Sequence, residues 1–211
     1  MRFDEPRLCP VDLGTGLLGA GDGHYRKTFA DLKGLYADEQ AFSAILAERA
    51  DEVAYEVTSY TPGGAVSDLI VGVTRMEPGK VGNEYFLTRG HIHARANRPE
   101  VYYGQKGHGL MQLESPDGEV RILEVGPQAI CYVPPFWIHR SINVGDEDLV
   151  MMFTYPADSG QDYGIIERSG GMKVRIVDDG NGGWAQQPNP DYVPRSAATI
   201  EKLLHDAGLA A

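Results

Sequence analysis

The stretch RGHIHARANRPEVYY, residues 89–103, contains two histidines one residue apart and then a glutamate. Residues i and i+2 of a β-strand lie on the same face, so His91 and His93 can point toward one spot. Glu100 lies an odd number of residues beyond His93 and would face the other way on one continuous strand. Residues 97–99, Asn-Arg-Pro, have the composition of a turn, which removes that constraint. We therefore expect that the three side chains can meet.

The bulk composition indicates one globular domain. The chain has 211 residues, of which 42% are apolar and 23% are charged. No window approaches the roughly 18 consecutive apolar residues of a membrane helix, and the N-terminal MRFDEPRLCP lacks the apolar run of a signal peptide. We expect a cytoplasmic protein with no membrane partner. The two cysteines are too few for a disulfide framework, and Cys131 is expected to be a small buried side chain.

The formal net charge of −11 argues against nucleic acid as a partner, because phosphate backbones bind basic patches. It is also an objection to an anionic substrate. A metal ion and a few oriented hydrogen-bond donors could still dominate the local field and bind a phosphorylated metabolite.

Short segments rich in β-branched and aromatic residues fill the middle of the chain. We expect strands at residues 52–61, 68–76, 84–88, 100–105, 108–114, 119–125, 129–134, 139–144, 149–155 and 172–177. The sequence SPDG at 115–118 is typical of a hairpin turn between two of them. Many short strands at this spacing predict an antiparallel sandwich or barrel.

Helices are expected near both ends of this run of strands. Residues 38–51 have apolar positions at helical spacing, with Asp38 as the N-cap. Residues 196–211 have the same pattern, since Ser196 can cap the helix and Gly208 can end it.

Residues 1 to about 23 read as an extended arm. They contain Gly14, Gly16 and Gly19 in the G-x-G-x-x-G spacing of a dinucleotide fingerprint, which needs a strand before it and a helix after it. Pro10 precedes the motif and further glycines follow it, so a flexible arm is the better interpretation. The expected organisation is an arm and helix at 1–50, a β-barrel at 51–180, and an extended segment and helix at 181–211. The β-barrel would carry a metal site that includes the two histidines and the glutamate of residues 89–103.

A fourth candidate ligand is His139, in YVPPFWIHRSINVG. About four short antiparallel strands bring a chain back beside its start, so His139 could face the first three side chains. Three imidazoles and one carboxylate would form a divalent-metal site that leaves two octahedral positions open. The set suits Fe(II), Mn(II), Ni(II) or Zn(II) and lacks the thiolates of a structural zinc site. The alternative is that the two neighbouring histidines are simply half-buried polar residues of a strand.

Two linked motifs carry a family resemblance: G-H-x-H-x6-E at residues 90–100 and P-x4-H-x3-N at residues 134–143. They resemble the paired motifs of the cupin superfamily. More narrowly, residues 50–170 resemble the cupin-type phosphoglucose isomerases through EYFLTRGHIHA, PEVYYGQKGHGLM, YVPPFWIHRSINVGDE and TYPADSGQDYG. The resemblance implies a mainly β fold, a cupin-type antiparallel β-barrel (jelly roll) with an N-terminal arm and two peripheral helices.

The resemblance implies roles for the matched positions. The metal ligands would be His91, His93, Glu100 and His139, holding one divalent ion per subunit, with Fe(II) favoured over Mn(II), Ni(II) and Zn(II). The phosphate and sugar site would be formed by Thr74, Thr88, Gly90, Tyr155, Gln161 and Tyr163. Glu100 would also be catalytic together with Tyr102, which lies two residues further along the same strand face. The chain departs from the family pattern at Gln161, where a histidine is frequent, and at Gln128 and Phe136, where cupins usually have glycine.

The activity that the resemblance implies is the reversible isomerisation of glucose 6-phosphate and fructose 6-phosphate, with the metal as Lewis acid. Glu100 could move the proton between C2 and C1, or a hydride could shift directly. Arg89 or Arg98 could add positive charge for the phosphate. The alternatives are a mannose 6-phosphate isomerase, an Fe(II) dioxygenase and a sugar-binding cupin.

A homodimer is expected, because a small barrel leaves sheet edges to cover and the arm could cross to a partner. The other histidines receive no active-site role. His108 lies in a turn and His205 near the end of the last helix, where both would face solvent, and His24 is unassigned.

Overall fold

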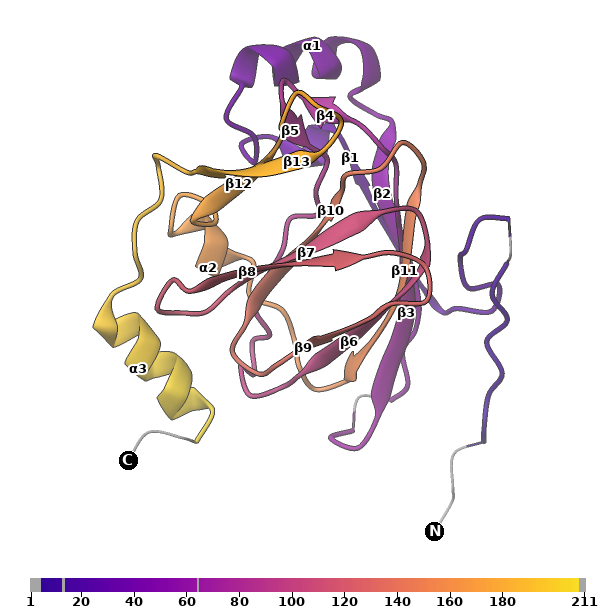
Figure 1. Ribbon diagram of the computed structural model, residues 1–211. Coiled ribbons are helices and arrows are strands. Elements are labelled where there is room, and N and C mark those ends of the chain that lie inside the picture. Colours follow the sequence, from indigo (N-terminus) through magenta and orange to yellow (C-terminus); the bar gives the residue numbers. More distant parts are fainter. Residues whose placement is uncertain (1–4, 13, 64, 209–211) are drawn as a thin grey trace.

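The computed structural model describes residues 5–12, 14–63 and 65–208, in which antiparallel strands form three hydrogen-bonded sheets (Figure 1). The first sheet contains, in spatial order, β1 (Gly23–Thr28), β2 (Val53–Tyr60), β3 (Leu69–Met76), β11 (Leu149–Pro156), β6 (Glu100–Lys106) and β9 (Ile130–Val133). The second contains β10 (Ile138–Asn143), β7 (Gly109–Glu114) and β8 (Val120–Val125). The third contains β13 (Trp184–Pro188), β12 (Val174–Asp178), β5 (Glu84–Tyr85) and β4 (Lys80–Val81).

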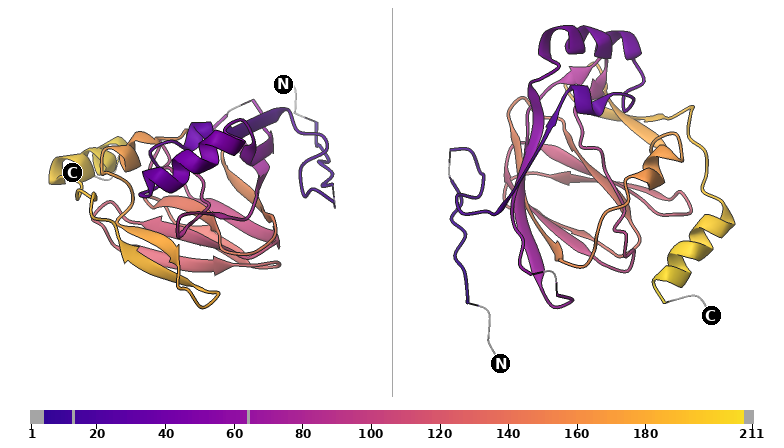
Figure 2. Two further views of the ribbon diagram at one scale, coloured as in Figure 1. Left: turned by 90° about the horizontal axis from the view of Figure 1, so that it is seen from above. Right: turned by 180° about the vertical axis from the view of Figure 1, so that it is seen from behind.

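The main hydrophobic core lies between the six-stranded and the three-stranded sheet (Figures 1 and 2). Tyr55 and Phe153 of the first sheet and Met111 and Ile142 of the second belong to it. Cys131 is also a buried member of this core, as predicted. The prediction of a mainly β, antiparallel jelly-roll fold is confirmed.

The strands do not close into one hydrogen-bonded barrel. Between β9 and β10 the chain leaves one sheet and enters another at Pro134 and Pro135, which have no backbone N–H to continue a ladder. Isolated bridges connect the regions instead, and one of them pairs His91 with His139. The predicted jelly roll therefore consists of two facing sheets with local bridges, and its strands do not form a closed hydrogen-bonded barrel.

Each of the ten predicted strand segments contains a strand, although the prediction at 84–88 shrinks to two residues. The hairpin at 115–118 is confirmed, because Gly118 N donates to Ser115 O at 2.9 Å between β7 and β8. Strand β1 was missed, since its GHYRKT sequence is mostly polar and exposed. It is recognisable only by its pairing with β2. Strand β13 lies in what the sequence suggested was an extended surface segment.

Both predicted helices are present with their predicted caps. Helix α1 (Glu39–Arg49) begins at Asp38, whose carboxylate accepts a hydrogen bond from Ala41 N at 2.8 Å. Helix α3 (Ala197–Asp206) begins at Ser196, whose hydroxyl accepts from Thr199 N at 3.2 Å. Two short helices were not predicted, the 3₁₀-helix η1 (Ala30–Leu32) and α2 (Gly164–Glu167). None of the helices in the described part of the chain has the length and apolar character that a membrane crossing requires.

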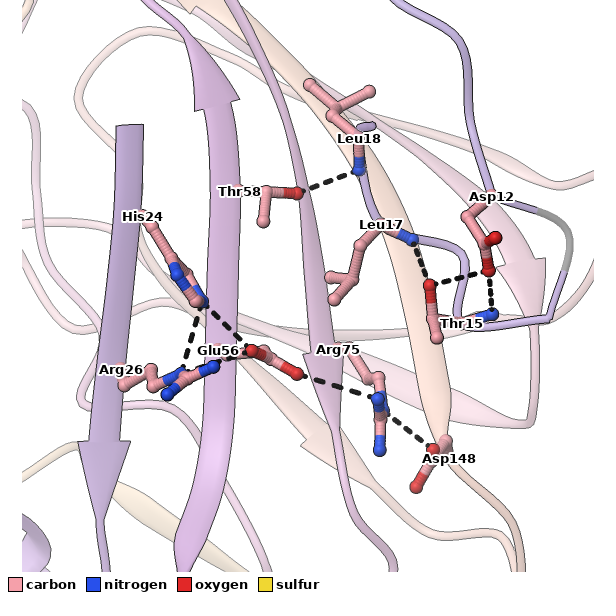
Figure 3. Close-up of polar contacts among 10 residues, drawn as sticks. All are labelled: Asp12, Thr15, Leu17, Leu18, His24, Arg26, Glu56, Thr58, Arg75 and Asp148. Carbon is pink, nitrogen blue, oxygen red and sulfur yellow. Dashed lines mark hydrogen bonds and ion pairs between the residues drawn. The ribbon is translucent and has the colours of Figure 1, made fainter. Parts of the chain in front are cut away.

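The described part of the arm lies against the outer face of the first sheet (Figure 3). Leu18 N donates to the hydroxyl of Thr58 on β2 at 2.9 Å, and the Leu18 side chain packs with Val73 and Val150. Beside it, Glu56 contacts His24 at 3.0 Å, which gives this histidine a place in a surface charge network. The glycine motif of the arm is followed by strand β1 and not by a helix, so the dinucleotide interpretation finds no support.

Two non-glycine residues of the described chain adopt a positive φ, Gln128 at +67° and Phe136 at +71°. Both stand where cupins usually have glycine. Gln128 N donates to Gly104 O at 2.9 Å, and Phe136 N donates to Ala96 O at 2.6 Å. These hydrogen bonds hold the backbone in the left-handed conformation without the residue that adopts it most readily.

Substitutions at Gln128 test this conformation. Gln128→Val should lower the free energy of unfolding by about 1–3 kcal/mol, because a β-branched residue at positive φ is strained. Gln128→Gly should leave that free energy equal to or above the wild-type value. Urea unfolding followed by circular dichroism gives both quantities, and a Gln128→Val variant as stable as the wild type would contradict the left-handed turn.

Candidate metal centre and substrate pocket

The four predicted ligands form one cluster, in which a ligand atom from each residue lies within 4.8 Å of the others. His91 and His93 follow Gly90 on the segment before β6, Glu100 is the first residue of β6, and His139 belongs to β10. The prediction that these side chains meet is confirmed.

Backbone hydrogen bonds bring the segments together. His91 N donates to His139 O at 3.0 Å, and His139 N donates to His91 O at 2.9 Å. Gly90, at φ +73°, precedes this bridge, and a Cβ there would lie 2.9 Å from His139 O. Only glycine fits this close approach without displacing the bridge. Gly90 therefore has a structural role in aligning the histidines, in addition to lining the pocket.

The turn between His93 and Glu100 orients one ligand. Arg98 N donates to Arg95 O at 3.0 Å, as expected for the predicted turn. The carbonyl of Arg98 lies 2.8 Å from His93 Nδ1. A carbonyl can only accept, so Nδ1 carries the proton and the lone pair of Nε2 is left free.

The same arrangement holds His139, whose Nδ1 lies 3.0 Å from the carbonyl of Trp137. Its Nε2 lies 2.9 Å from Glu100 Oε2. The Nε2 atoms of His91 and His93 are buried without a hydrogen-bond partner in the described residues. That of His93 is 3.2 Å from Glu100 Oε2 but is not aligned for a hydrogen bond. Unpaired buried nitrogens are costly, and a metal ion in their midst would satisfy them.

The charges of the cluster suit a divalent cation. Burial alone would raise the pKa of Glu100, but the close contacts of its carboxylate with the His139 and His93 side chains outweigh it and hold the pKa well below its usual value. Burial, followed by the charge of His139, lowers the pKa of His91 well below 6.5. An ionised Glu100 beside a neutral His91 is the protonation state of these two residues that metal binding requires.

A cavity of about 300 Å³ opens beside the cluster. Its walls include every predicted substrate-binding residue, namely Thr74, Thr88, Gly90, Tyr155, Gln161 and Tyr163. His91, Glu100 and Tyr102 also line it, whereas His93 and His139 do not. The metal cluster and the predicted substrate site therefore share a wall.

The two arginines considered for phosphate binding do not line the cavity. Arg98 donates two hydrogen bonds to Asp158, at 2.9 and 2.7 Å. Arg89 pairs with Glu167 at 2.7 Å and lies over the Tyr163 ring, 4.7 Å from its centroid. Both guanidinium groups already have partners, so an anion in the cavity would depend on other donors.

Several pocket residues were missed by the sequence analysis, namely Tyr25, Tyr55, Val57, Ser59, Ser141 and Phe153. Most could have been found by strand periodicity. Ser141 lies two residues after His139 and Phe153 two before Tyr155, on the same faces of their strands. Tyr25 could not, because its strand β1 was itself missed.

The phenolic groups of the pocket remain neutral donors at physiological pH. Burial, and then the charge of Glu100, raises the pKa of Tyr155 to about 12. The same two causes raise the pKa of Tyr102 well above 10. Tyr163 is hydrogen-bonded to Gln161, so these two residues form one wall of the cavity.

Comparison with known proteins assigns this arrangement to a family. The family model for glucose-6-phosphate isomerase matches residues 26–194. The chain belongs to the glucose-6-phosphate isomerase family. The match includes both motifs that carry the metal cluster.

Two relatives show the extent of the similarity. A glucose-6-phosphate isomerase of Sinorhizobium medicae (strain WSM419) is 61% identical over 199 residues, which cover 94% of this chain and 93% of the relative. A glucose-6-phosphate isomerase of Thermococcus kodakarensis is 42% identical over 180 residues, which cover 85% of this chain and 94% of the relative. Among solved structures, an oxalate oxidase in complex with the substrate analogue glycolate aligns with a TM-score of 0.44 and 17% identity, over 52% of this chain and 55% of that one.

The metal-free protein should lose stability as the pH falls from about 7.5 to 5.5. The folded pKa of His91 lies well below its unfolded value of 6.5, so the unfolded chain binds more protons in this range and stability rises with pH. His91→Gln should reduce this dependence by up to about 1.4 kcal/mol per pH unit. Urea unfolding at several pH values measures it, with His205→Gln on the exposed face of α3 as control. Equal pH dependence in His91→Gln and the wild type would contradict the buried neutral state.

Proposed function

We propose that this protein interconverts glucose 6-phosphate and fructose 6-phosphate with one divalent metal ion per subunit, held by His91, His93, Glu100 and His139. One observation carries the proposal. Glu100 belongs to the metal cluster and is also the one carboxylate among the described residues that line the cavity. A base for the substrate carbons and a Lewis acid for their oxygens would thus lie at the same end of the cavity.

The lining suits a phosphorylated sugar. It offers hydroxyl groups from Thr74, Thr88 and the tyrosines, an amide from Gln161, and no lysine or arginine among the described residues. Thr88 Oγ1 accepts from Ser141 N at 3.1 Å, which leaves the Thr88 hydroxyl proton free to donate to a phosphate oxygen. An apolar lining of the kind expected for an Fe(II) dioxygenase is not what the cavity presents.

A divalent metal bound by the cluster would act as a Lewis acid and stabilise negative charge on the substrate oxygens. The unpartnered Nε2 atoms of His91 and His93 support its presence. Nitrogen and oxygen donors without thiolates accept Fe(II), Mn(II), Ni(II) or Zn(II), and Fe(II) is the first choice.

Proton transfer between C1 and C2 is assigned to Glu100. All three histidine contacts of its carboxylate are made by Oε2, at 2.9, 3.2 and 4.0 Å. Oε1 makes none of these contacts and can be directed at the substrate. Tyr102, protonated and on the same strand face, can donate to the substrate or to the carboxylate. Gln161 can hold a sugar hydroxyl but cannot move a proton.

Metal removal tests the proposal. Protein stripped with EDTA should lose the conversion of fructose 6-phosphate to glucose 6-phosphate, and addition of Fe(II), Mn(II), Ni(II) or Zn(II) should restore it to different degrees. Coupled NADP reduction measures the rate, with mannose 6-phosphate as a parallel substrate. Bound metal without any isomerase activity would contradict the proposal and favour an oxygenase or a sugar-binding protein.

Solvent isotope incorporation tests the role of Glu100. Fructose 6-phosphate formed from glucose 6-phosphate in D₂O should carry deuterium at C1, because a proton held by a carboxylate exchanges with solvent. Glu100→Gln should lower kcat by about 10²–10⁴-fold, and metal analysis of the variant separates lost catalysis from lost metal. Complete retention of the substrate hydrogen would identify a direct hydride shift instead.

The proposal includes a homodimer formed by the outer face of strand β9. Ile130 is 73% exposed and Tyr132 is 54% exposed, and these two large side chains lie on the same face of this edge strand. Strand β9 ends the six-stranded sheet whose outer face also carries the arm.

A cytoplasmic location is part of the proposal, because a phosphate ester crosses membranes poorly.

Light scattering on a sizing column tests the dimer. The wild type should have the mass of two chains and Tyr132→Asp that of one, because burying an unpaired carboxylate opposes association. Leu123→Asp on β8, 41% exposed and outside the proposed interface, should leave the mass unchanged. A monomeric wild type at micromolar concentration would overturn the dimer.

A further inference from the structure

A second cavity, of about 340 Å³, lies on the other side of strand β10 from the metal cluster. Side chains alternate along a strand, so Arg140 lines this cavity from the opposite face to its neighbours. His139 belongs to the metal cluster and Ser141 lines the substrate pocket. The walls come from the segment between η1 and α1, from helix α2 and from strand β12, which Figure 1 places around β10.

Arg140 is a buried cation without an anionic partner. Only 6% of the residue is exposed, and its Nε donates to Met172 Sδ at 3.0 Å. The two terminal nitrogens of the guanidinium make no hydrogen bond with the described residues, and no carboxylate of those residues lies within 4.0 Å. A guanidinium group stays protonated in proteins, so the side chain is charged at neutral pH.

A second polar group of the same cavity lacks a partner. Tyr36 is 5% exposed, and its hydroxyl oxygen is buried without a hydrogen bond in the described part of the chain. The residues that line this cavity therefore include one charged and one neutral donor, Arg140 and Tyr36.

The acidic residues around the cavity are engaged elsewhere or exposed. Glu84 pairs with Arg175 at 3.0 Å, and Asp191 lies 3.9 Å from the same arginine. Glu167 pairs with Arg89 at 2.7 Å, and Glu39 is exposed at the start of α1. None of them forms an ion pair with Arg140; Glu84 and the buried Glu114, which pairs with Arg195, act on its charge only from beyond 4.0 Å.

We propose that this cavity is a second ligand site, which binds a small anion bearing a carboxylate or a phosphate group through Arg140 and Tyr36. A guanidinium presents two parallel N–H groups that match either anion, and a phenolic hydroxyl can donate a third hydrogen bond. Binding would also remove the penalty of an unpaired buried charge. The site is separate from the substrate pocket and does not depend on the proposed isomerase activity.

Crystals of the full chain soaked with selenate locate the site directly. An anomalous peak within hydrogen-bond distance of the Arg140 guanidinium and the Tyr36 hydroxyl supports the proposal. Anomalous density near Thr74 and Thr88 alone, or none in the second cavity, overturns it.

Calorimetric titration tests the site in solution with inorganic phosphate and, separately, with malonate. Arg140→Met should lose the binding event, and Tyr36→Phe should weaken it about tenfold, the value of one hydrogen bond to a charged group. Tyr36→Phe removes an oxygen that has no protein partner, so it keeps the fold even if Arg140→Met does not.

Two control variants separate this site from other anion contacts. Thr74→Val removes a hydroxyl of the substrate pocket and should leave the second binding event intact. Arg121→Met removes an exposed arginine, which already pairs with Glu119, and should change nothing. Binding of one probe only identifies the anion class, whereas equal binding by the wild type and Tyr36→Phe, or binding of neither probe, refutes the site.

Discussion

Two backbone hydrogen bonds between His91 and His139 hold the candidate active site together. They join the segment before β6 to strand β10, which belong to different parts of the fold. Because Gly90 allows the two backbones to approach, the imidazoles of both histidines reach the carboxylate of Glu100. The remaining hydrogen bonds, from the carbonyls of Arg98 and Trp137, then orient two of the rings. The metal cluster is thus a consequence of main-chain pairing, with the side chains held in position by the backbone around them.

The proposed function requires an acidic protein to recognise an anionic sugar. The net charge is −11, and no basic side chain of the described residues lines the substrate cavity. Burial keeps Tyr102 and Tyr155 protonated, so the cavity contains neutral hydrogen-bond donors, which need no counter-charge from the protein. Arg89 and Arg98 are each committed to a carboxylate. In the proposed function, positive charge at the substrate would therefore come from the metal ion, close to the reacting atoms.

Sequence reasoning was most successful where the signal is local. The sequence predicted the strands from their periodicity, the helix caps Asp38 and Ser196, and the hairpin at 115–118. Each of these features depends mainly on neighbouring residues. The resemblance to the cupin-type isomerases then predicted four metal ligands, whose side chains do meet, and six substrate-binding residues, which all line the cavity. Strand β1 escaped because its exposed polar residues carry no apolar pattern, and only its partner β2 makes it a strand.

The sequence by itself determined the candidate ligands of this protein: two histidines one residue apart, a glutamate beyond a turn, and a later histidine in a matching motif. The tertiary structure alone decided which groups remain free. It paired Arg98 with Asp158, enclosed Arg140 without a carboxylate and left the Nε2 atoms of His91 and His93 without partners. The physical reason is that residue type and spacing set local conformation. Whether a buried polar group finds a partner depends on segments that are tens of residues apart in the chain and meet only in the folded protein.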